Sequence, residues 1–257
     1  MATPALFDTH CHLGYGELAE DAPEALVARA HAAGVTQLLD VGVDAASSRR
    51  AAERARQLPG VHFAAGLHPN ETDRFEAEWP ALRALAQDPR CIAVGETGLD
   101  YHWDKAPHDV QRRAFAAHLE LGARLDKAVI VHARKALDDA LAILADHRAA
   151  RVVLHCFAGD ERDVARAADL GCRLSFAGPL TYPNAAALRR AACAAPAELL
   201  LVETDAPFLA PQSRRGKRNE PAFVVEVARQ LAALRGVDFE ELAASTTANA
   251  RALFALG

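Results

Sequence analysis

The chain has 257 residues, of which 51% are hydrophobic and 25% are charged, and its formal net charge at pH 7 is −5. This length and composition suffice to bury the core of one barrel domain or of two smaller domains. The net negative charge argues against a generally basic nucleic-acid-binding protein. A local basic patch is still compatible with this net charge. No apolar run approaches the roughly 20 residues that cross a bilayer, and the N-terminus lacks a signal-peptide pattern, so we expect a cytoplasmic protein without a membrane partner.

Short apolar runs rich in β-branched residues recur along the chain and alternate with segments of helical spacing, such as 22–34 and 110–125. The runs predict eight strands, at 5–12, 35–43, 61–69, 91–99, 128–134, 151–157, 172–179 and 198–207. Alternating strands and helices imply a parallel sheet covered by helices. The number of units and the chain length favour one closed (β/α)8 TIM barrel over 1–257. An open doubly wound sheet is the alternative, and no GxGxxG turn follows the first run to support it.

The five cysteines form no CxxC pair and are odd in number. A disulfide framework is therefore not expected, and we interpret the cysteines as reduced thiols.

Residues able to bind a metal gather where the predicted strands end, which is where such barrels build their chemistry. His10 and His12 flank Cys11, and alternation along a strand directs both imidazoles to the same side. Imidazole and carboxylate together suit zinc, manganese and similar ions. One histidine at a strand end is usually only a hydrogen-bonded residue, but convergence from several strands favours a metal site. The candidates are His10, His12, His68, Glu96, His132, His155 and Asp205.

The ordered blocks DTHCHL, GLHP, VGETGLDYH, VHAR, HCFAG, ETDAPFLAP and RGKRNEP resemble the TatD family of metal-dependent deoxyribonucleases, within the amidohydrolase-like barrels. The resemblance extends from Phe7 to the C-terminal TTANARALF. It implies a two-metal hydrolase in which Glu96 bridges the ions. His10, His12 and Asp205 would hold one ion, and His132 and His155 the other.

Two such ions would generate hydroxide near neutral pH and neutralise the attacking and leaving oxygens of a phosphodiester. Asp205 is then the candidate general base. Glu203, two residues earlier, is expected to lie deeper and to support a ligand. His68 is assigned to the substrate, as a phosphate contact or a proton donor to the leaving oxygen, with simple hydrogen bonding to a ligand as the alternative.

The basic stretch SRRGKRNEP at 213–221 follows the last predicted strand, where barrels commonly bind phosphate. Arg215, Lys217 and Asn219 are its candidate substrate contacts. Contacts to the phosphate backbone carry little sequence specificity. Tyr101, Trp103 and Phe208 are candidates for stacking on the bases of a single strand, although such residues more often serve packing.

These features predict a divalent-metal-dependent nuclease, an exonuclease on single-stranded DNA ends, with Mg, Mn and Zn all compatible with the ligands. Hydrolysis of an amide or ester, such as a D-aminoacyl-tRNA, is the alternative, because the same barrel serves acyl chemistry in related proteins. A metal-binding scaffold without activity is a third possibility that the complete ligand set disfavours. No obligate protein partner is expected.

Overall fold

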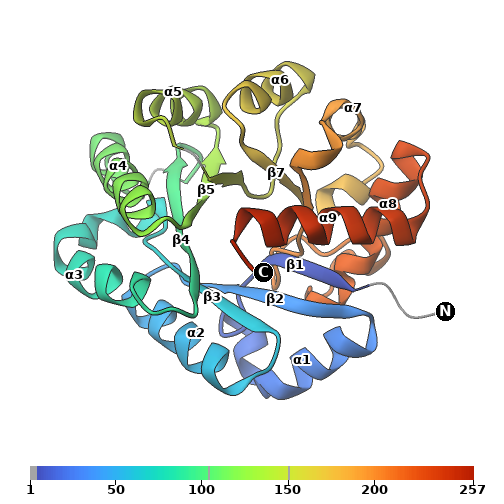
Figure 1. The fold of residues 1–257 in the computed structure, drawn as a ribbon, viewed down its shortest axis with the longest axis horizontal. Coiled ribbons are helices and arrows are strands. Elements are labelled where there is room, and N and C mark those ends of the chain that lie inside the picture. The colour runs from blue at the N-terminus through green and yellow to red at the C-terminus, as the bar shows by residue number, and fades with distance from the viewer. Residues whose placement is uncertain (1–4, 104, 150) are drawn as a thin grey trace.

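The computed structural model describes residues 5–103, 105–149 and 151–257. Eight parallel strands follow one another around the molecule in chain order, from β1 to β8 (Figure 1). The strands are β1 (Leu6–Cys11), β2 (Val35–Val41), β3 (Val61–Ala65), β4 (Cys91–Asp100), β5 (Ala128–Arg134), β6 (Val152–Leu154), β7 (Arg173–Phe176) and β8 (Leu200–Val202).

Backbone hydrogen bonds join the first strand to the segment that follows the last one. The amide of His12 donates to the carbonyl of Ala206 over 2.8 Å, and the amide of Asp205 donates to the carbonyl of His10 over 2.9 Å. These bonds bring the two edges of the sheet together, and the predicted (β/α)8 barrel is confirmed.

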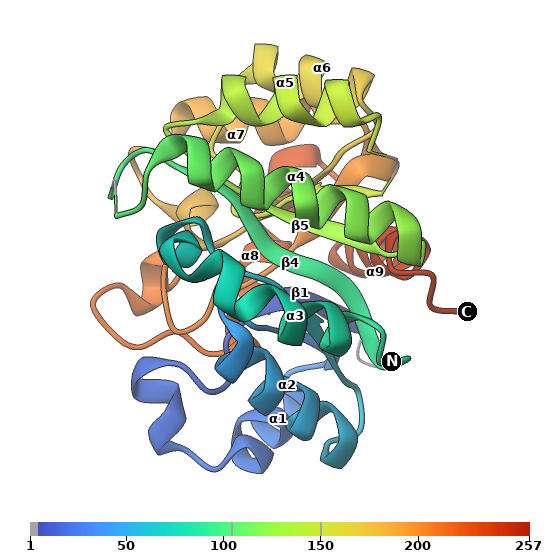
Figure 2. The ribbon, with the colours of Figure 1, turned by 90° about the vertical axis from the view of Figure 1, so that its left-hand side faces the viewer.

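Helices surround the strands, as Figures 1 and 2 show. They are α1 (Pro23–Ala32), α2 (Ala45–Gln57), α3 (Phe75–Ala86), α4 (His108–Leu125), α5 (Leu137–His147), α6 (Glu161–Asp169), α7 (Ala186–Ala194), α8 (Val224–Arg235) and α9 (Phe239–Leu253). Local sequence explains several of their ends. Asp44 and Asp160 begin α2 and α6 with capping boxes, and Gly236 ends α8 in the left-handed conformation at φ 67°.

Helix α9 contacts β1 and β8 and has no partner strand after it. Its last turn and the following residue supply Ala250, Leu253 and Phe254 to a buried cluster that also contains Phe7 and Leu39. Figure 2 shows α9 on the side of the molecule where the chain ends lie. This helix therefore covers the N-terminal end of the barrel and leaves the opposite end for the candidate site.

Six predicted strands are longer than the observed ones, and three of them illustrate the reason. β3 ends at Ala65, β6 at Leu154 and β8 at Val202, so the residues beyond them form loops and short 3-10 turns. In two of these loops the backbone turns into the left-handed region, at Cys156 with φ 44° and at Asp205 with φ 55°. A strand does not continue through such a residue.

The cysteines Cys11, Cys91, Cys156, Cys172 and Cys193 are all free thiols in the described structure, as expected. Within residues 5–103, 105–149 and 151–257, no helix combines the length and apolar character that a membrane crossing requires.

Candidate metal centre

Glu96, in the middle of β4, lies at the centre of the candidate site and is only 3% exposed. β4 can approach β5 closely at this point because the residue before Glu96 is Gly95. A Cβ atom on Gly95 would lie 2.8 Å from the carbonyl oxygen of Ile130, and its φ of 139° also excludes other residues. The close approach of β4 to β5 places Glu96 beside His132.

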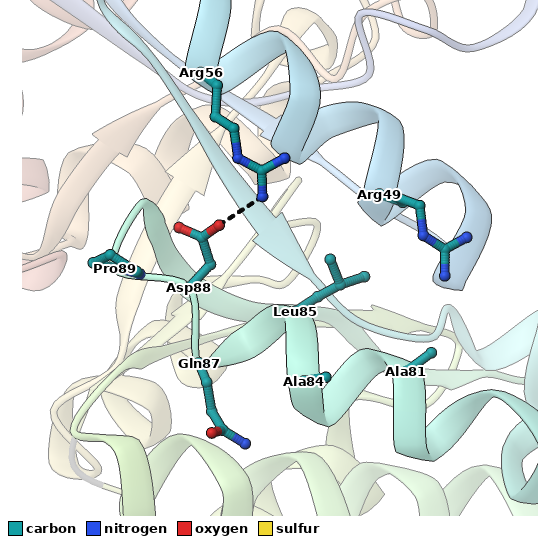
Figure 3. Close-up of a pocket in the computed structure, with 8 residues that line it drawn as sticks. All are labelled: Arg49, Arg56, Ala81, Ala84, Leu85, Gln87, Asp88 and Pro89. Carbon is teal, nitrogen blue, oxygen red and sulfur yellow. Dashed lines mark hydrogen bonds and ion pairs between the residues drawn. The ribbon is translucent and has the colours of Figure 1, made fainter.

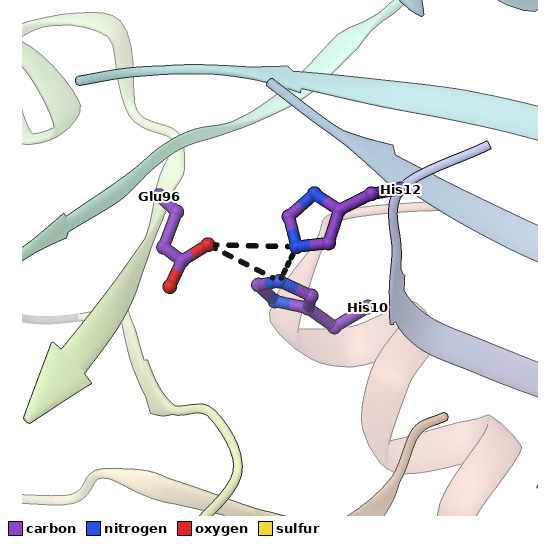
Figure 4. A group of neighbouring side chains, drawn as sticks. All are labelled: His10, His12 and Glu96. Atoms are coloured by element: carbon purple, nitrogen blue, oxygen red, sulfur yellow. Dashed lines mark hydrogen bonds and ion pairs between the residues drawn. The ribbon is translucent and has the colours of Figure 1, made fainter. Parts of the chain in front are cut away.

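One oxygen of Glu96 faces the two histidines from β1, as Figure 4 shows. Its Oε2 lies 3.4 Å from Nε2 of His10 and 3.7 Å from Nε2 of His12. Oδ1 of Asp205 lies 3.8 Å and 3.5 Å from the same two nitrogens. Two imidazoles and two carboxylates thus converge on one small volume.

The other oxygen of Glu96 faces His132, in β5, and His155, directly after β6. Its Oε1 lies 2.9 Å from Nδ1 of His132 and 2.8 Å from Nε2 of His155, and these two nitrogens are 3.1 Å apart. The His155 ring also stacks on His10, with 4.1 Å between ring centroids. The two groups of ligand atoms therefore adjoin one another and share Glu96.

Outer hydrogen bonds fix the tautomer of three of the four candidate histidine ligands beside Glu96, whereas Nδ1 of His10 has no hydrogen-bond partner among the described residues. Nδ1 of His12 donates to the carbonyl of Val41 over 2.8 Å. Nε2 of His132 donates to Oδ2 of Asp100 over 3.2 Å, and Nδ1 of His155 donates to Glu203 over 3.3 Å. The inward nitrogens are then left with lone pairs, as in histidines that bind metals.

These lone pairs point at carboxylate oxygens, which are also acceptors. Acceptors held 2.8–3.7 Å apart without a proton between them repel each other, and a cation between them removes the repulsion. The residues present therefore fit divalent metal ions. Two such groups are His10 with His12 and Glu96, and Glu96 with His132 and His155; the ligand atoms within each lie within 4.8 Å of one another.

Charge and burial shift the pKa values of this cluster in opposite directions. Burial would raise the pKa of Glu96. When the inward nitrogens carry protons instead of holding an ion, the positive charge of His155 and hydrogen bonds from His10 and His132 lower this pKa well below its usual value. Burial lowers the pKa of His12, but Asp205 and Glu96 together raise it to about 9. The centre is thus built to keep its carboxylates ionised.

His68 lies at the open side of the centre, after β3, and its Nε2 is 3.6 Å from Oε1 of Glu96. Its Nδ1 accepts a hydrogen bond from the amide of Asn70 over 3.1 Å, which leaves the proton on Nε2. Burial lowers the pKa of His68 to about 3, so the ring is a neutral donor directed at the centre.

The buried Asp8 belongs to the frame and not to the ligand set. It accepts hydrogen bonds from the amide and the hydroxyl of Thr204, over 2.9 Å and 2.6 Å. Burial raises the pKa of Asp8 to about 8 despite these bonds. Asp8 thereby fixes the segment between Glu203 and Asp205 against β1.

The predicted substrate contacts differ in their surroundings. Arg215 and Lys217 are exposed, and the guanidinium carbon of Arg215 lies 4.0 Å from the ring centroid of Tyr182. Asn219 is completely buried, and its amide nitrogen donates to the carbonyls of Thr204 and Phe208 over 2.8 Å and 2.6 Å. The expected contact between Asn219 and substrate is therefore corrected: its side chain has no exposed surface and instead holds the loop after β8.

Two residues next to the centre were not expected from the sequence. Asp100 accepts hydrogen bonds from His132, from the side chain of Asn70 and from the amides of His102 and Trp103. Its place in the block VGETGLDYH, four residues after Glu96, is the signal that could have identified it. Tyr15, beyond the end of β1, lies beside His12 with 6.1 Å between ring centroids.

A hollow of about 530 Å³ lies on the outside of the barrel between α2 and the end of α3 (Figure 3). Arg56 and Asp88 form an ion pair of 2.8 Å on its wall. It contains no imidazole and adjoins the start of β4, at the end of the barrel opposite the metal ligands. Its lining residues are Arg49, Arg56, Ala81, Ala84, Leu85, Gln87, Asp88 and Pro89.

Residues 7–255 match the family model of TatD related DNase. The chain belongs to the TatD family. It is 38% identical over 252 residues to an uncharacterized metal-dependent hydrolase of Bacillus subtilis, YabD, with 97% of this chain and 98% of the relative covered. It is 36% identical over 260 residues to a 3'-5' ssDNA/RNA exonuclease TatD of Erwinia amylovora, with 98% and 100% covered.

The TatD relationship extends to the solved structures. The crystal structure of YJJV, a TatD homolog from Escherichia coli, superposes with a TM-score of 0.93 at 30% sequence identity, and covers 98% of both chains. The chain is accordingly a metal-dependent hydrolase of the TatD family.

Proposed function

We propose that this TatD protein hydrolyses phosphodiester bonds of DNA and removes nucleotides from single-stranded ends, using two divalent ions. The observation that supports the proposal best is the position of Glu96 between two groups of ligands. Its Oε2 faces His10 and His12, and its Oε1 faces His132 and His155. A carboxylate divided in this way suits two adjacent cations better than one.

Two ions held here would supply Lewis acidity to both the attacking and the leaving oxygen of a phosphodiester. Asp205 completes the first ligand group and is 9% exposed, so its carboxylate reaches the edge that a substrate water approaches. We assign it the role of general base, which takes the proton of that water. His68 offers Nε2–H to a phosphate oxygen on the other side.

The loop after β8 carries exposed positive charge. Arg215 stacks on Tyr182, which holds its planar guanidinium in one orientation, and Lys217 is exposed beside it. Both side chains suit the phosphate backbone and do not discriminate bases. An acidic protein can therefore bind a polyanion through this local patch.

The names of several relatives favour a nucleic acid over an acyl substrate. The relatives from Erwinia amylovora, Salmonella typhimurium and Klebsiella pneumoniae are named 3'-5' ssDNA/RNA exonucleases, and at least 98% of each is covered by this chain. By analogy with these relatives, we propose that the present chain degrades single strands in the 3'-to-5' direction and accepts RNA as a second substrate.

The proposal is tested by comparing substrates on the metal-loaded protein. The panel contains single-stranded DNA with a label at either end, the same sequence as a blunt duplex, single-stranded RNA, a p-nitrophenyl ester and a D-aminoacyl-tRNA. We expect stepwise shortening of single strands from the 3' end, and no product with a His132→Ala variant. Turnover confined to the ester or the aminoacyl-tRNA would replace the nuclease with an acyl hydrolase.

A further inference from the structure

Two exposed aromatic rings from opposite ends of the chain meet beside the metal centre. Tyr15, beyond β1, is 46% exposed and Phe208, beyond β8, is 43% exposed. Their ring centroids lie 5.5 Å apart, and each lies 6.1 Å from the ring of His12. The pair is therefore in direct contact with a metal ligand while its other surface faces solvent.

The backbone around both rings is fastened to the ligand segments. The amide of Tyr15 donates to the carbonyl of His12 over 3.2 Å, and the amide of Phe208 donates to the carbonyl of Asp205 over 2.9 Å. The buried Asn219 also fixes the backbone at Phe208, because its side-chain amide donates to the Phe208 carbonyl over 2.6 Å. The backbone of both aromatic residues is thus held against the ligand segments.

Exposed aromatic area of this kind is unfavourable unless something covers it. Leu209, beside Phe208, is also 37% exposed, but it carries no ring and is not part of the aromatic pair. The neighbouring loop carries the cations Arg215 and Lys217. The rings suit a planar group with an apolar face, and the cations suit a negative charge. A nucleotide has both, in its base and its phosphate.

We propose that Tyr15 and Phe208 form a stacking subsite for an unpaired base next to the scissile phosphate, and that this subsite sets the preference for single strands. The inference rests on the proposed nuclease function. A base inside a duplex is stacked on its neighbours and has no free face, so only an unpaired base enters the subsite. Every base has a π face, and the subsite is therefore tolerant of sequence.

The test pairs changes in the ring with removal of the base. Intact oligonucleotides are compared with oligonucleotides carrying an abasic residue at the terminal or the second position. Their kcat/KM values are measured on the wild-type protein and on Phe208→Leu, Tyr15→Leu and Leu209→Ala variants. Leu209→Ala is the matched control, since it removes exposed apolar surface from the same loop without removing a ring.

We expect the wild-type protein to lose about five- to hundredfold in kcat/KM when the base at one of the two positions is removed. Phe208→Leu and Tyr15→Leu should lower kcat/KM for the intact strand and leave it unchanged for that abasic strand, while Leu209→Ala behaves as wild type. The preference for a single strand over a blunt duplex should fall in both ring variants.

Equal losses on intact and abasic strands would show that the rings only support the loop, and no loss on either would show that no base stacks there. Both results would overturn the subsite and leave the nuclease proposal intact. Absence of hydrolysis of every oligonucleotide by the wild-type protein would instead overturn the proposed function.

Discussion

At the scale of single residues, the metal centre depends on which nitrogen of each imidazole carries the proton. Val41, Asp100 and Glu203 accept from the outer nitrogens of His12, His132 and His155. That these candidate ligands lie together could be predicted, because histidines and carboxylates recur at strand ends and a position along the chain is visible in a sequence. The pairing of Asp100 with His132 crosses from β4 to β5, and only the register of the two strands reveals it.

Replacing Asp100 by Asn should weaken metal binding about 10- to 100-fold, because the amide no longer fixes the Nε2–H tautomer of His132. The dissociation constant can be measured by calorimetry or by competition with a chelating dye. Asp139→Asn is the matched control, since Asp139 pairs with Tyr101 and Arg112 and contacts no ligand of the centre. Equal affinity in both variants would remove Asp100 from the metal centre.

Replacing Glu96 by Ala should lower metal occupancy in both ligand groups, since each group loses one carboxylate oxygen. Turnover should then fall by orders of magnitude, because the ions and the water they activate are lost together. Elemental analysis, circular dichroism and DNA hydrolysis on one sample provide the measurement. Two ions per folded chain with near-normal turnover would show that Glu96 is not a bridge.

At the scale of elements, the strands were predicted in the right order but extended too far at their C-terminal ends. Apolar runs continue past Ala65, Leu154 and Val202 because the loops at the mouth are themselves buried. Periodicity records burial, whereas a strand also requires a neighbour for its hydrogen bonds. Asp205 is itself in the left-handed conformation in such a loop, and strand alternation therefore does not direct its side chain to the centre.

His118 connects α4 to the loop after β3 and should make the stability of the barrel depend on pH. Its Nδ1 donates to the carbonyl of Ala114 over 2.7 Å, and its Nε2 accepts from the amide of Leu67 over 3.1 Å. Burial lowers its pKa to about 4, from about 6.5 in an unfolded chain. As the pH falls, the unfolded chain takes up the proton before the folded chain does. The stabilisation that neutral His118 gives the folded state is therefore complete above pH 6.5 and is lost as the pH falls to 4.

The difference between these pKa values corresponds to about 3 kcal/mol of unfolding free energy. Chemical denaturation at several pH values should show that the wild-type protein loses more stability than His118→Gln over this interval. Glutamine can still donate and accept but does not titrate there. Both proteins are measured with a chelator present, so that bound ions do not contribute. Parallel plots of unfolding free energy against pH for the two proteins would contradict the assignment.

At the scale of the whole molecule, the two ends of the barrel have separate tasks. α9 and residues such as Phe7 close the N-terminal end with a buried apolar cluster, while the ligands project from the other end. The alternation of strands and helices was sufficient to predict the barrel. It did not predict that α9 closes one end, because packing across a barrel end leaves no periodic pattern in the sequence.

This separation predicts that a chelator abolishes hydrolysis without unfolding the chain. Ions that bind only the folded state add stability, so their removal should lower the thermal midpoint. The apolar clusters do not depend on the ions, and imidazoles that take up protons can donate to Glu96, which lies 2.8 Å from His155 and 2.9 Å from His132. Far-ultraviolet circular dichroism should therefore stay unchanged after chelation, and adding a divalent ion should restore both the thermal midpoint and DNA hydrolysis. Full hydrolysis by a metal-stripped sample would refute metal dependence, and loss of the dichroism signal would refute the independence of the barrel from its metal centre.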